Sequence, residues 1–448
     1  MDDHRILSGG EWSRERWWYK LVQVCQRWRY LILGSASYLQ VCLLCTFGTP
    51  IVDMLEHSPP LPLILDYLDG NNHDIDTKVE DGIIFALQHR NRVRRIRLLM
   101  PMPNLRKLIP VIDNEFPMLE FLNVEASTKD DDGNLMVPST FRAPHLRHLM
   151  IINFDFPLGS PLLTTSIAIV TLSLQKIDVS ASFSPNDLLQ RLSLMPQLET
   201  LGILFHYHAL DIIERGLMDM PITSYVTLPY LRWFGFGGPS AYLEVFLSCI
   251  TTPILEKLQI MFSNQTTFSV SNLLQLMATT KTLRLGSAKI DFDDTGVAVA
   301  VYPHAGSKTY AFHMDVACGG LRRQAFSLAE ILTVLSPGFS AVERVALAYA
   351  HDGWISTRDI IQVTAEFDRP QWRELLGSFK NLKTLLVEDK LVSVISHCLQ
   401  LGEGEHPLDL LPELQELSYS AEGNAGDGFA KFIDARRAAG HPVALIRH

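Results

Sequence analysis

The stretch "LEFLNV" at residues 119–124 places apolar side chains at its first, fourth and sixth positions. The last two alternate with polar residues, as in a short strand that buries one face and leaves the other in solvent. The same phrase recurs along most of the chain. Its copies are "VRRIRL" at 93, "LRHLMI" at 146, "IVTLSL" at 169, "LETLGI" at 198, "LRWFGF" at 231, "LEKLQI" at 255, "VERVAL" at 342, "LKTLLV" at 382 and "LQELSY" at 414, with weaker copies "TKTLRL" at 280 and "AFHMDV" at 311.

The spacing of the copies indicates a repeat architecture. From residue 93 to residue 280 the steps are 26, 27, 23, 29, 33, 24 and 25 residues. A phrase of this form at intervals of roughly 20–29 residues is typical of leucine-rich repeats. The Asn or Cys that such repeats normally carry in the turn is replaced, so the repeats are degenerate. The replacements are Ser127, Phe154, His206, Pro239 and Ser263. The alternative is a non-repeat α/β fold in which strands happen to recur at a similar spacing.

Helix start signals lie between the phrases. Ser184 precedes Pro185 and the apolar run that follows, which predicts an N-cap there. Ser327 with Glu330 reads as a capping box, and Ser356 with Asp359 as its acidic variant. Ser271 similarly precedes an apolar run. Strand, turn and helix repeated in this way predict an α/β solenoid, with a curved parallel sheet inside and helices outside.

Composition narrows the class of protein. Of the 448 residues, 47% are apolar and 20% charged, which is ordinary for a folded chain. The net charge of −10 argues against a partner that is mainly nucleic acid or an anionic membrane surface. Six cysteines make no disulfide framework, and we expect the Cys42–Cys45 pair to lie in a buried strand. A reducing compartment, cytoplasmic and/or nuclear, follows as an expectation.

The N-terminal segment "WWYKLVQVCQRWRYLILG", residues 17–34, has its own pattern. Apolar residues recur every three to four positions, which predicts one amphipathic helix that ends at Gly34. The stripe consists of Trp17, Leu21, Val24 or Cys25, Trp28, and Leu31 or Ile32. Such a helix could cap the end of the solenoid, or it could be a docking element whose aromatic residues anchor a partner.

Residues 21–39, "LVQVCQRWRYLILGSASYL", resemble the second half of an F-box. The following "LLCTFGTPIVDMLEHSPPLPLILDY" is similar to the segment after the F-box in a class of F-box proteins from basidiomycete fungi that end in degenerate leucine-rich repeats. The residues before Trp17 are too few for a complete first F-box helix, so the expected F-box is truncated. The resemblance implies an F-box-like region with connector over residues 1–57 and a repeat domain over 58–448.

The resemblance also implies a function. Such proteins are substrate-recognition subunits of Skp–cullin–F-box ubiquitin ligases, which bind a Skp-type adaptor, and through it a cullin, and present a protein substrate on the repeats. The residues that match the adaptor-binding positions are Leu21, Val24, Cys25, Trp28 and Leu31, with Arg27 and Arg29 as a polar rim. The alternative is a repeat protein outside any ligase, whose N-terminal helix only caps the solenoid.

The register of the phrases also predicts where a substrate would bind. Residues on either side of the second apolar position should point to the concave face of a leucine-rich-repeat sheet. These candidate contacts are Arg95, Arg97, Phe121, Asn123, His148, Met150, Trp233, Lys257 and Gln259. Arg90, Arg92, Arg94, Arg95 and Arg97 could form a nucleic-acid patch, but their alternation with apolar residues favours a solvent-facing strand, and an acidic partner segment is the next alternative.

Signals for catalysis are weak. The sequence contains no G-x-S-x-G, H-E-x-x-H or Walker loop, so a hydrolase on an α/β fold lacks its nucleophile motif. No cofactor or metal site is predicted. The sequence therefore favours a non-enzymatic interaction protein.

Overall fold

The structure is a computed structural model of the chain. It describes residues 17–35, 39, 41–68, 75–127, 135–177, 184–206, 224–263, 265, 267–349, 368–388, 390–402, 404–420 and 428–448. The protein is an α/β protein built on a long, largely parallel sheet in which strands alternate with helices. Its contacts divide it into two compact units, unit 1 (Met1–Phe183 and Gln190–Leu198) and unit 2 (Ser184–Leu189 and Glu199–His448).

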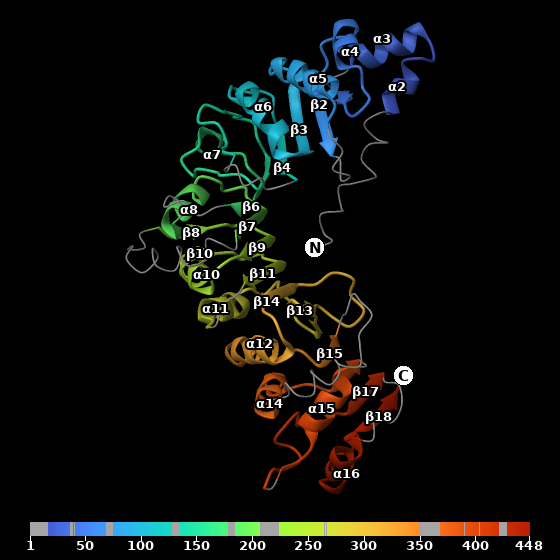
Figure 1. The fold of residues 1–448 in the computed structure, drawn as a ribbon, viewed down its shortest axis with the longest axis vertical. Helices are drawn as coiled ribbons and strands as arrows, with labels where there is room; N and C mark the ends of the chain where they lie inside the picture. Colours follow the sequence, from blue (N-terminus) through green and yellow to red (C-terminus); the bar gives the residue numbers. More distant parts are fainter. Residues whose placement is uncertain are drawn as a thin grey trace. The chain divides into compact units, whose positions relative to one another are not determined.

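In the described part of unit 1, six strands pair in chain order, each parallel to the next. The strands are β1 (Leu43–Cys45), β2 (Leu63–Leu68), β3 (Val93–Met100), β4 (Phe121–Ala126), β5 (His148–Ile152) and β6 (Thr171–Ile177). The helices are α2 (Trp17–Leu21), α3 (Gln26–Gly34), α4 (Ile51–His57), α5 (Thr77–Gln88), α6 (Met102–Ile112) and α7 (Pro161–Thr165), with α8 (Pro185–Leu192) continuing across the division of the chain. Figure 1 shows α5 and α6 on one side of β2, β3 and β4.

Unit 2 contains the remaining strands and helices. The strands of its main sheet are β7 (Thr200–Phe205), β9 (Trp233–Gly237), β11 (Lys257–Ser263), β12 (Ser287–Phe292), β13 (Gly296–Tyr302), β14 (Phe312–Ala317), β15 (Arg344–Tyr349), β16 (Thr384–Glu388), β17 (Glu416–Ser420) and β18 (Ala444–Arg447). A separate pair is formed by β8 (Val226–Thr227) and β10 (Ile250–Thr251). The helices are α10 (Ser240–Leu247), α11 (Ser271–Thr279), α12 (Leu321–Leu335), α14 (Arg369–Gly377), α15 (Leu391–Leu399) and α16 (Ala430–Ala438).

The recurrent phrase predicts these strands well. The first apolar residue of each strong copy is buried just before or at the start of a strand; Leu119, Leu146, Leu198, Leu231 and Leu255 have no exposed surface. The strands that follow them pair in parallel with their neighbours. The predicted parallel array of alternating strands is therefore confirmed for these copies. The weak copy at 280 does not form a strand, since residues 281–286 precede β12 as turn and irregular chain.

An antiparallel insertion interrupts the parallel order of unit 2. The sheet order there is β11–β14–β13–β12–β15, and β13 is antiparallel to both of its neighbours. The Asp293 carboxylate shapes the turn between β12 and β13, because it accepts the backbone N–H of Thr295 (2.6 Å) and Gly296 (2.8 Å). Because β14 rather than β12 lies beside β11, the repeat order is reversed over this part of the chain.

The helix start signals are confirmed in part. Ser184 caps α8: its hydroxyl accepts the N–H of Asp187 at 3.2 Å and donates to the Asp187 carboxylate at 2.6 Å. The capping box at Ser327 is wrong, because α12 begins at Leu321 and Ser327 is buried in its interior. Ser356 and Asp359 lie outside the described residues.

The helix after Ser271 has a cap that comes from another element. Ser271 is the first residue of α11 and makes no capping hydrogen bond. Instead, the buried carboxylate of Glu244 in α10 accepts the N–H of Asn272 (2.7 Å) and of Leu273 (3.0 Å). A negative charge at a helix N-terminus is stabilising, so this contact joins two successive helices of unit 2.

Cys42 and Cys45 are buried at strand β1, as expected. Cys42 packs with Leu44 and Ile64 in a small apolar cluster, and burial raises the pKa of the Cys45 thiol to about 12. No helix in the described part of the chain is both long and apolar enough to cross a membrane.

Candidate binding surfaces

The N-terminal segment forms two helices, where the sequence predicts one. Helix α2 ends at Leu21, a turn follows, and α3 runs from Gln26 to the predicted last residue, Gly34. In the turn, Val24 N–H donates to the Leu21 carbonyl at 3.2 Å, and the Arg29 side chain donates to the Val22 carbonyl at 3.1 Å. The predicted single helix is therefore wrong over residues 22–25, where local backbone and arginine contacts replace helical bonds.

The break changes which apolar residues are buried. Trp18, which lies outside the predicted stripe, is the residue that packs into the fold: it is 5% exposed, and its indole N–H donates to the Cys42 carbonyl at 3.2 Å. Its ring stacks on Tyr19 with centroids 4.2 Å apart. Ile32 is buried from α3. The adjacent tryptophans at 17 and 18 were a visible signal, and the hydrogen bond to Cys42 shows that Trp18 is anchored.

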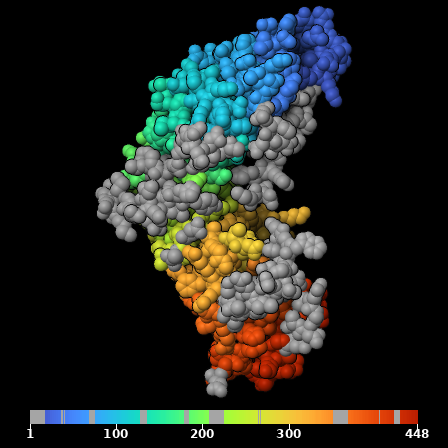
Figure 2. All heavy atoms as spheres, in the orientation of Figure 1, coloured from blue at the N-terminus to red at the C-terminus, as the bar shows by residue number. Residues whose placement is uncertain are grey.

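The five predicted adaptor-binding residues lie on α2, the turn and α3. Leu21 is half-buried, whereas Cys25 is exposed. Val24 is 64% exposed, Trp28 44% and Leu31 60%, and the neighbouring Tyr30, which the sequence reasoning did not select, is 70% exposed. We call Val24, Cys25, Trp28, Tyr30 and Leu31 the α3 patch. In the space-filling view, the dark-blue atoms of this part of the chain lie at the surface of unit 1 (Figure 2).

Apolar exposure on this scale has an energetic meaning. Full burial of one large apolar side chain is worth about 1.5–3 kcal/mol. Monomeric proteins seldom leave such residues clustered in water unless the surface binds something. The α3 patch contains Trp28 and Tyr30, and the exposed Arg27 and Arg29 are their neighbours in the chain. Trp, Tyr and Arg are the residue types that dominate binding energy at protein interfaces.

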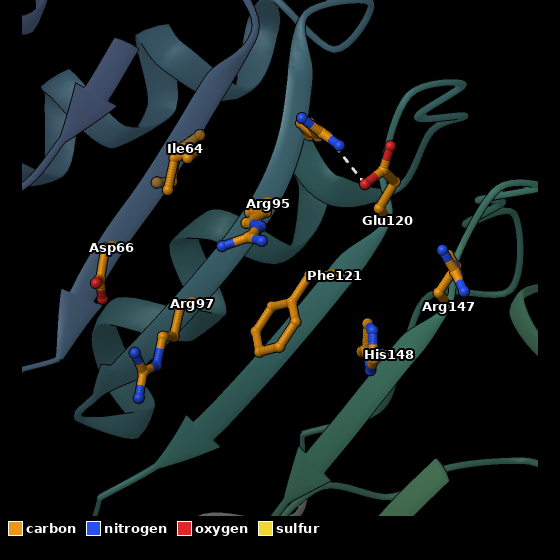
Figure 3. Close-up of a pocket in the computed structure, with 10 residues that line it drawn as sticks. Ile64, Asp66, Arg95, Arg97, Glu120, Phe121, Arg147 and His148 are labelled. Atoms are coloured by element: carbon orange, nitrogen blue, oxygen red, sulfur yellow. Dashed lines mark ion pairs between the residues drawn. The ribbon is translucent and has the colours of Figure 1, made fainter. Parts of the chain in front are cut away.

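The predicted substrate contacts in unit 1 share one face of the sheet. Arg95, Phe121 and His148 are register partners across β3, β4 and β5, and Arg97, Asn123 and Met150 form the next row. The intervening residues Ile96, Leu98, Leu122 and Leu149 are buried on the opposite face. Figure 3 shows the labelled side chains on the near side of the strands, with helices behind them. We call the near side the open face.

A pocket of about 380 Å³ opens on this face. It is lined by Ile64, Leu65, Asp66, Arg94, Arg95, Arg97, Glu120, Phe121, Arg147 and His148. Four of the predicted contacts, Arg95, Arg97, Phe121 and His148, are thus brought together in it. Asn123 and Met150 lie on the same face outside the lining, and Asn123 Oδ1 is buried without a hydrogen-bond partner among the described residues.

A local irregularity places consecutive arginines in the pocket. Leu63 pairs with Val93 but Ile64 pairs with Arg95, so Arg94 has no register partner on β2. Such a bulge re-aims a side chain that would otherwise point to the other face. Arg94 forms an ion pair with Glu120 at 2.9 Å, drawn as the dashed line in Figure 3. Partial burial acts to lower the pKa of Arg94, but the hydrogen bond and charge of Glu120 outweigh it, and the net pKa is raised.

The other arginines near this strand have structural partners. Arg92 donates to the backbone carbonyls of Leu61 (3.0 Å) and Pro59 (3.2 Å), and Arg90 donates to the Asn114 side chain. The predicted strand with arginines on its solvent side is confirmed for β3, with Val93, Ile96 and Leu98 buried. Arg90 and Arg92 precede or flank the strand and hold neighbouring loops.

In unit 2, two of the three predicted contacts, Lys257 and Gln259, lie beside Tyr310. Lys257 is the register partner of Trp233, and its ammonium group lies 5.9 Å from the centroid of the Tyr310 ring. The Tyr310 hydroxyl donates to Gln259 Oε1 at 3.3 Å. Trp233 is half-buried and lies against Gly235, so it is less exposed than an indole that protrudes from the sheet.

The groups that could take part in chemistry can be placed within the described residues. The glycine-rich stretch at 234–240 is the end of β9 and the start of α10, and the Ser240 N–H donates to the Gln265 side chain at 2.9 Å. In the described ranges, no three His, Cys, Asp or Glu side chains are grouped so that they could hold a metal ion. The sequence matches no protein-family profile, and no curated protein is significantly similar to it.

Proposed function

We propose that this protein is a substrate-recognition subunit of a Skp–cullin–F-box type ubiquitin ligase. In this proposal the α3 patch, with Leu21, binds a Skp-type adaptor and through it a cullin, and the open faces of the sheet bind a protein substrate. The protein would act in the cytoplasm and/or nucleus and would have no catalytic activity of its own. The proposal starts from the F-box resemblance of residues 17–68.

The observation that carries the proposal is the exposure of Trp28, Val24 and Leu31 next to the firmly packed Trp18. Trp18 and Ile32 attach this segment to unit 1, so the exposed residues are presented from a fixed support. Trp28 and Leu31 are three residues apart on α3 and so lie on neighbouring parts of one helix surface. A surface of this kind suits a helical, apolar partner groove.

We further infer that the array is a leucine-rich-repeat-like solenoid with a curved sheet. Support comes from the single strand that follows each strong phrase, the parallel pairing of successive strands, and the helices that alternate with them. The antiparallel strand β13 is a departure from a regular array. A continuous sheet of this type offers a long open surface for a protein substrate.

A second candidate is a repeat protein without a ligase, whose N-terminal helices only cap the sheet. The hydrogen bond from the Trp18 indole to the Cys42 carbonyl favours it, since this bond holds α2 against the residue just before β1, the first strand in the sheet order. In that case Trp18 and Ile32 hold the cap in place, and the α3 patch has no adaptor to bind.

Capture of a Skp-type adaptor separates the two candidates. A tagged fungal adaptor is co-expressed with the wild-type chain, with Trp28→Ala, and with Tyr225→Ala as the control. Tyr225 is 79% exposed and lies in unit 2, so its truncation removes an exposed aromatic residue from another surface. The ligase proposal predicts that wild type and Tyr225→Ala are retained and that Trp28→Ala is lost. Equal retention of all three, or retention of none, contradicts it.

A further inference from the structure

The pocket on the open face of unit 1 has a charge opposite to that of the whole protein. Among the residues that the structure describes, its lining contains the guanidinium groups of Arg94, Arg95, Arg97 and Arg147 and the carboxylates of Asp66 and Glu120. The chain as a whole carries a net charge of −10. A concave site of one sign concentrates ligands of the other sign, so this pocket selects negatively charged ligands.

The four guanidinium groups outnumber the two carboxylates among the described lining residues. Glu120 is paired with Arg94 at the edge of the pocket, at 2.9 Å. Asp66 is only 6% exposed and is the register partner of Arg97 on the neighbouring strand. Arg95 and the exposed Arg147 lie on different strand segments on the two sides of Phe121 (Figure 3). A ligand that reaches both needs more than one negative group.

The centre of the pocket is apolar and aromatic. The half-buried Phe121 ring lies between Arg95 and His148 in the same register row, and its centroid is 5.8 Å from that of the His148 ring. Ile64 adds an aliphatic wall on the Arg95 side. Aromatic faces favour flat or apolar ligand groups, and the adjacent guanidinium groups favour negatively charged ones.

We propose that this pocket binds an acidic peptide segment in which Asp or Glu residues flank an aromatic or large aliphatic side chain. The central side chain packs on Phe121 and Ile64, and carboxylates on either side pair with Arg95 and Arg147. Guanidinium groups bind carboxylates in a two-pronged geometry, which adds direction to the attraction. The idea that this segment is the recognition element of a ubiquitin-ligase substrate rests on the proposed function. The idea that the pocket binds such a segment rests on the pocket's residues alone.

Fluorescence anisotropy with the full chain tests the proposal. The probes are a labelled Glu-Glu-Tyr-Glu-Glu peptide, its Gln-Gln-Tyr-Gln-Gln counterpart and a short single-stranded DNA. At low salt, we expect the glutamate peptide to bind about tenfold or more tighter than the glutamine peptide, since several ion pairs of modest strength add up. Added salt should lower the affinity for the glutamate peptide, because it screens the ion pairs.

Variants locate the binding. Arg147→Gln and Arg95→Gln should each weaken the binding of the glutamate peptide by about threefold or more, because each removes one ion pair with the peptide. Arg142→Gln, an exposed arginine just before β5 and outside the pocket lining, should leave the affinity unchanged. Because Arg147 is exposed, its variant keeps the test valid even where Arg95→Gln fails to fold.

Three results would overturn the proposal: equal affinity for the two peptides, equal weakening by Arg142→Gln and Arg147→Gln, or DNA that binds tighter than the glutamate peptide. Adaptor capture is measured on the same preparations. If the wild-type chain binds the glutamate peptide but captures no adaptor, only the ligase proposal is contradicted. If it captures the adaptor but does not bind the glutamate peptide, only the peptide site is contradicted.

Discussion

The indole of Trp233 lies against Gly235, two residues further along strand β9, so closely that a Cβ added at position 235 would fall 2.9 Å from the Trp233 Cζ2 atom. Both residues lie on the same face of β9, where their register partners on β11 are Lys257 and Gln259. The glycine therefore lets the indole lie down on the sheet, where it is half-buried.

Gly235→Ala tests this relationship. The new methyl group must push the indole aside, and we expect a loss of about 1–3 kcal/mol in the free energy of unfolding, as for other overpacked sites. Urea denaturation measures it. In the Trp233→Ala background the same glycine substitution should cost much less, because the clash is gone. Equal costs in the two backgrounds would show that the indole lies elsewhere.

Trp18 and Trp28 form a second pair for comparison. Trp18→Ala removes a 5%-exposed indole and its hydrogen bond to Cys42, and should cost about 3–5 kcal/mol of stability. Trp28 is 44% exposed, so Trp28→Ala should cost less than about 1 kcal/mol.

Thermal and urea denaturation of both variants give the comparison. If Trp28→Ala proves as destabilising as Trp18→Ala, then Trp28 packs as a capping residue, and the α3 patch loses its main member.

Glu244 is expected to stabilise unit 2 through the N-terminus of α11. Glu244→Gln leaves a single uncharged oxygen where a carboxylate now accepts two backbone N–H groups, so it should lower the free energy of unfolding by about 1–3 kcal/mol. Ser271→Ala is the matched control, at the exposed first residue of the same helix, and should change stability by no more than about 0.5 kcal/mol. A larger effect for Ser271 than for Glu244 would reverse the assignment of the cap.

Cys25 provides a reporter within the α3 patch. It is the exposed one of the six cysteines, and the other five are buried. Burial also raises the pKa of Cys45 and of Cys398 to about 12, so near neutral pH these two thiols stay protonated and unreactive. Alkylation of the native protein should therefore label one thiol per chain, identified by mass spectrometry as Cys25. Rapid labelling of Cys45 or Cys398 under native conditions would contradict their burial.

The strands could be predicted because their signal is local. In "LEFLNV" or "LEKLQI" the buried and exposed positions alternate within six residues, and the structure places Leu122, Val124, Leu258 and Ile260 inside accordingly. The same alternation predicted which residues of unit 1 share the open face, such as Arg95, Phe121 and His148. The cap at Ser184 was equally local, since its partner Asp187 is three residues away.

The features that the sequence did not predict depend on distant partners. Glu244 caps a helix 28 residues further on, so the nearby Ser271 was a misleading signal. The bulge that brings Arg94 into the pocket depends on pairing with Leu63 and Ile64 of β2. The reversed order of β12, β13 and β14 follows from strand pairing, which a repeating phrase does not specify. The anchoring of Trp18 likewise depends on a distant partner, the carbonyl of Cys42 just before β1.

The central claim is that the exposed α3 patch binds a Skp-type adaptor, and isothermal titration of purified adaptor into the protein tests it most directly. We predict saturable binding by wild type, with a negative heat-capacity change from apolar burial. Trp28→Ala should raise the dissociation constant by about 30-fold or more, which corresponds to an interface residue worth about 2 kcal/mol. Tyr225→Ala should leave the dissociation constant unchanged. An adaptor that does not bind the wild-type chain, or that binds Trp28→Ala with the same affinity, would contradict the claim.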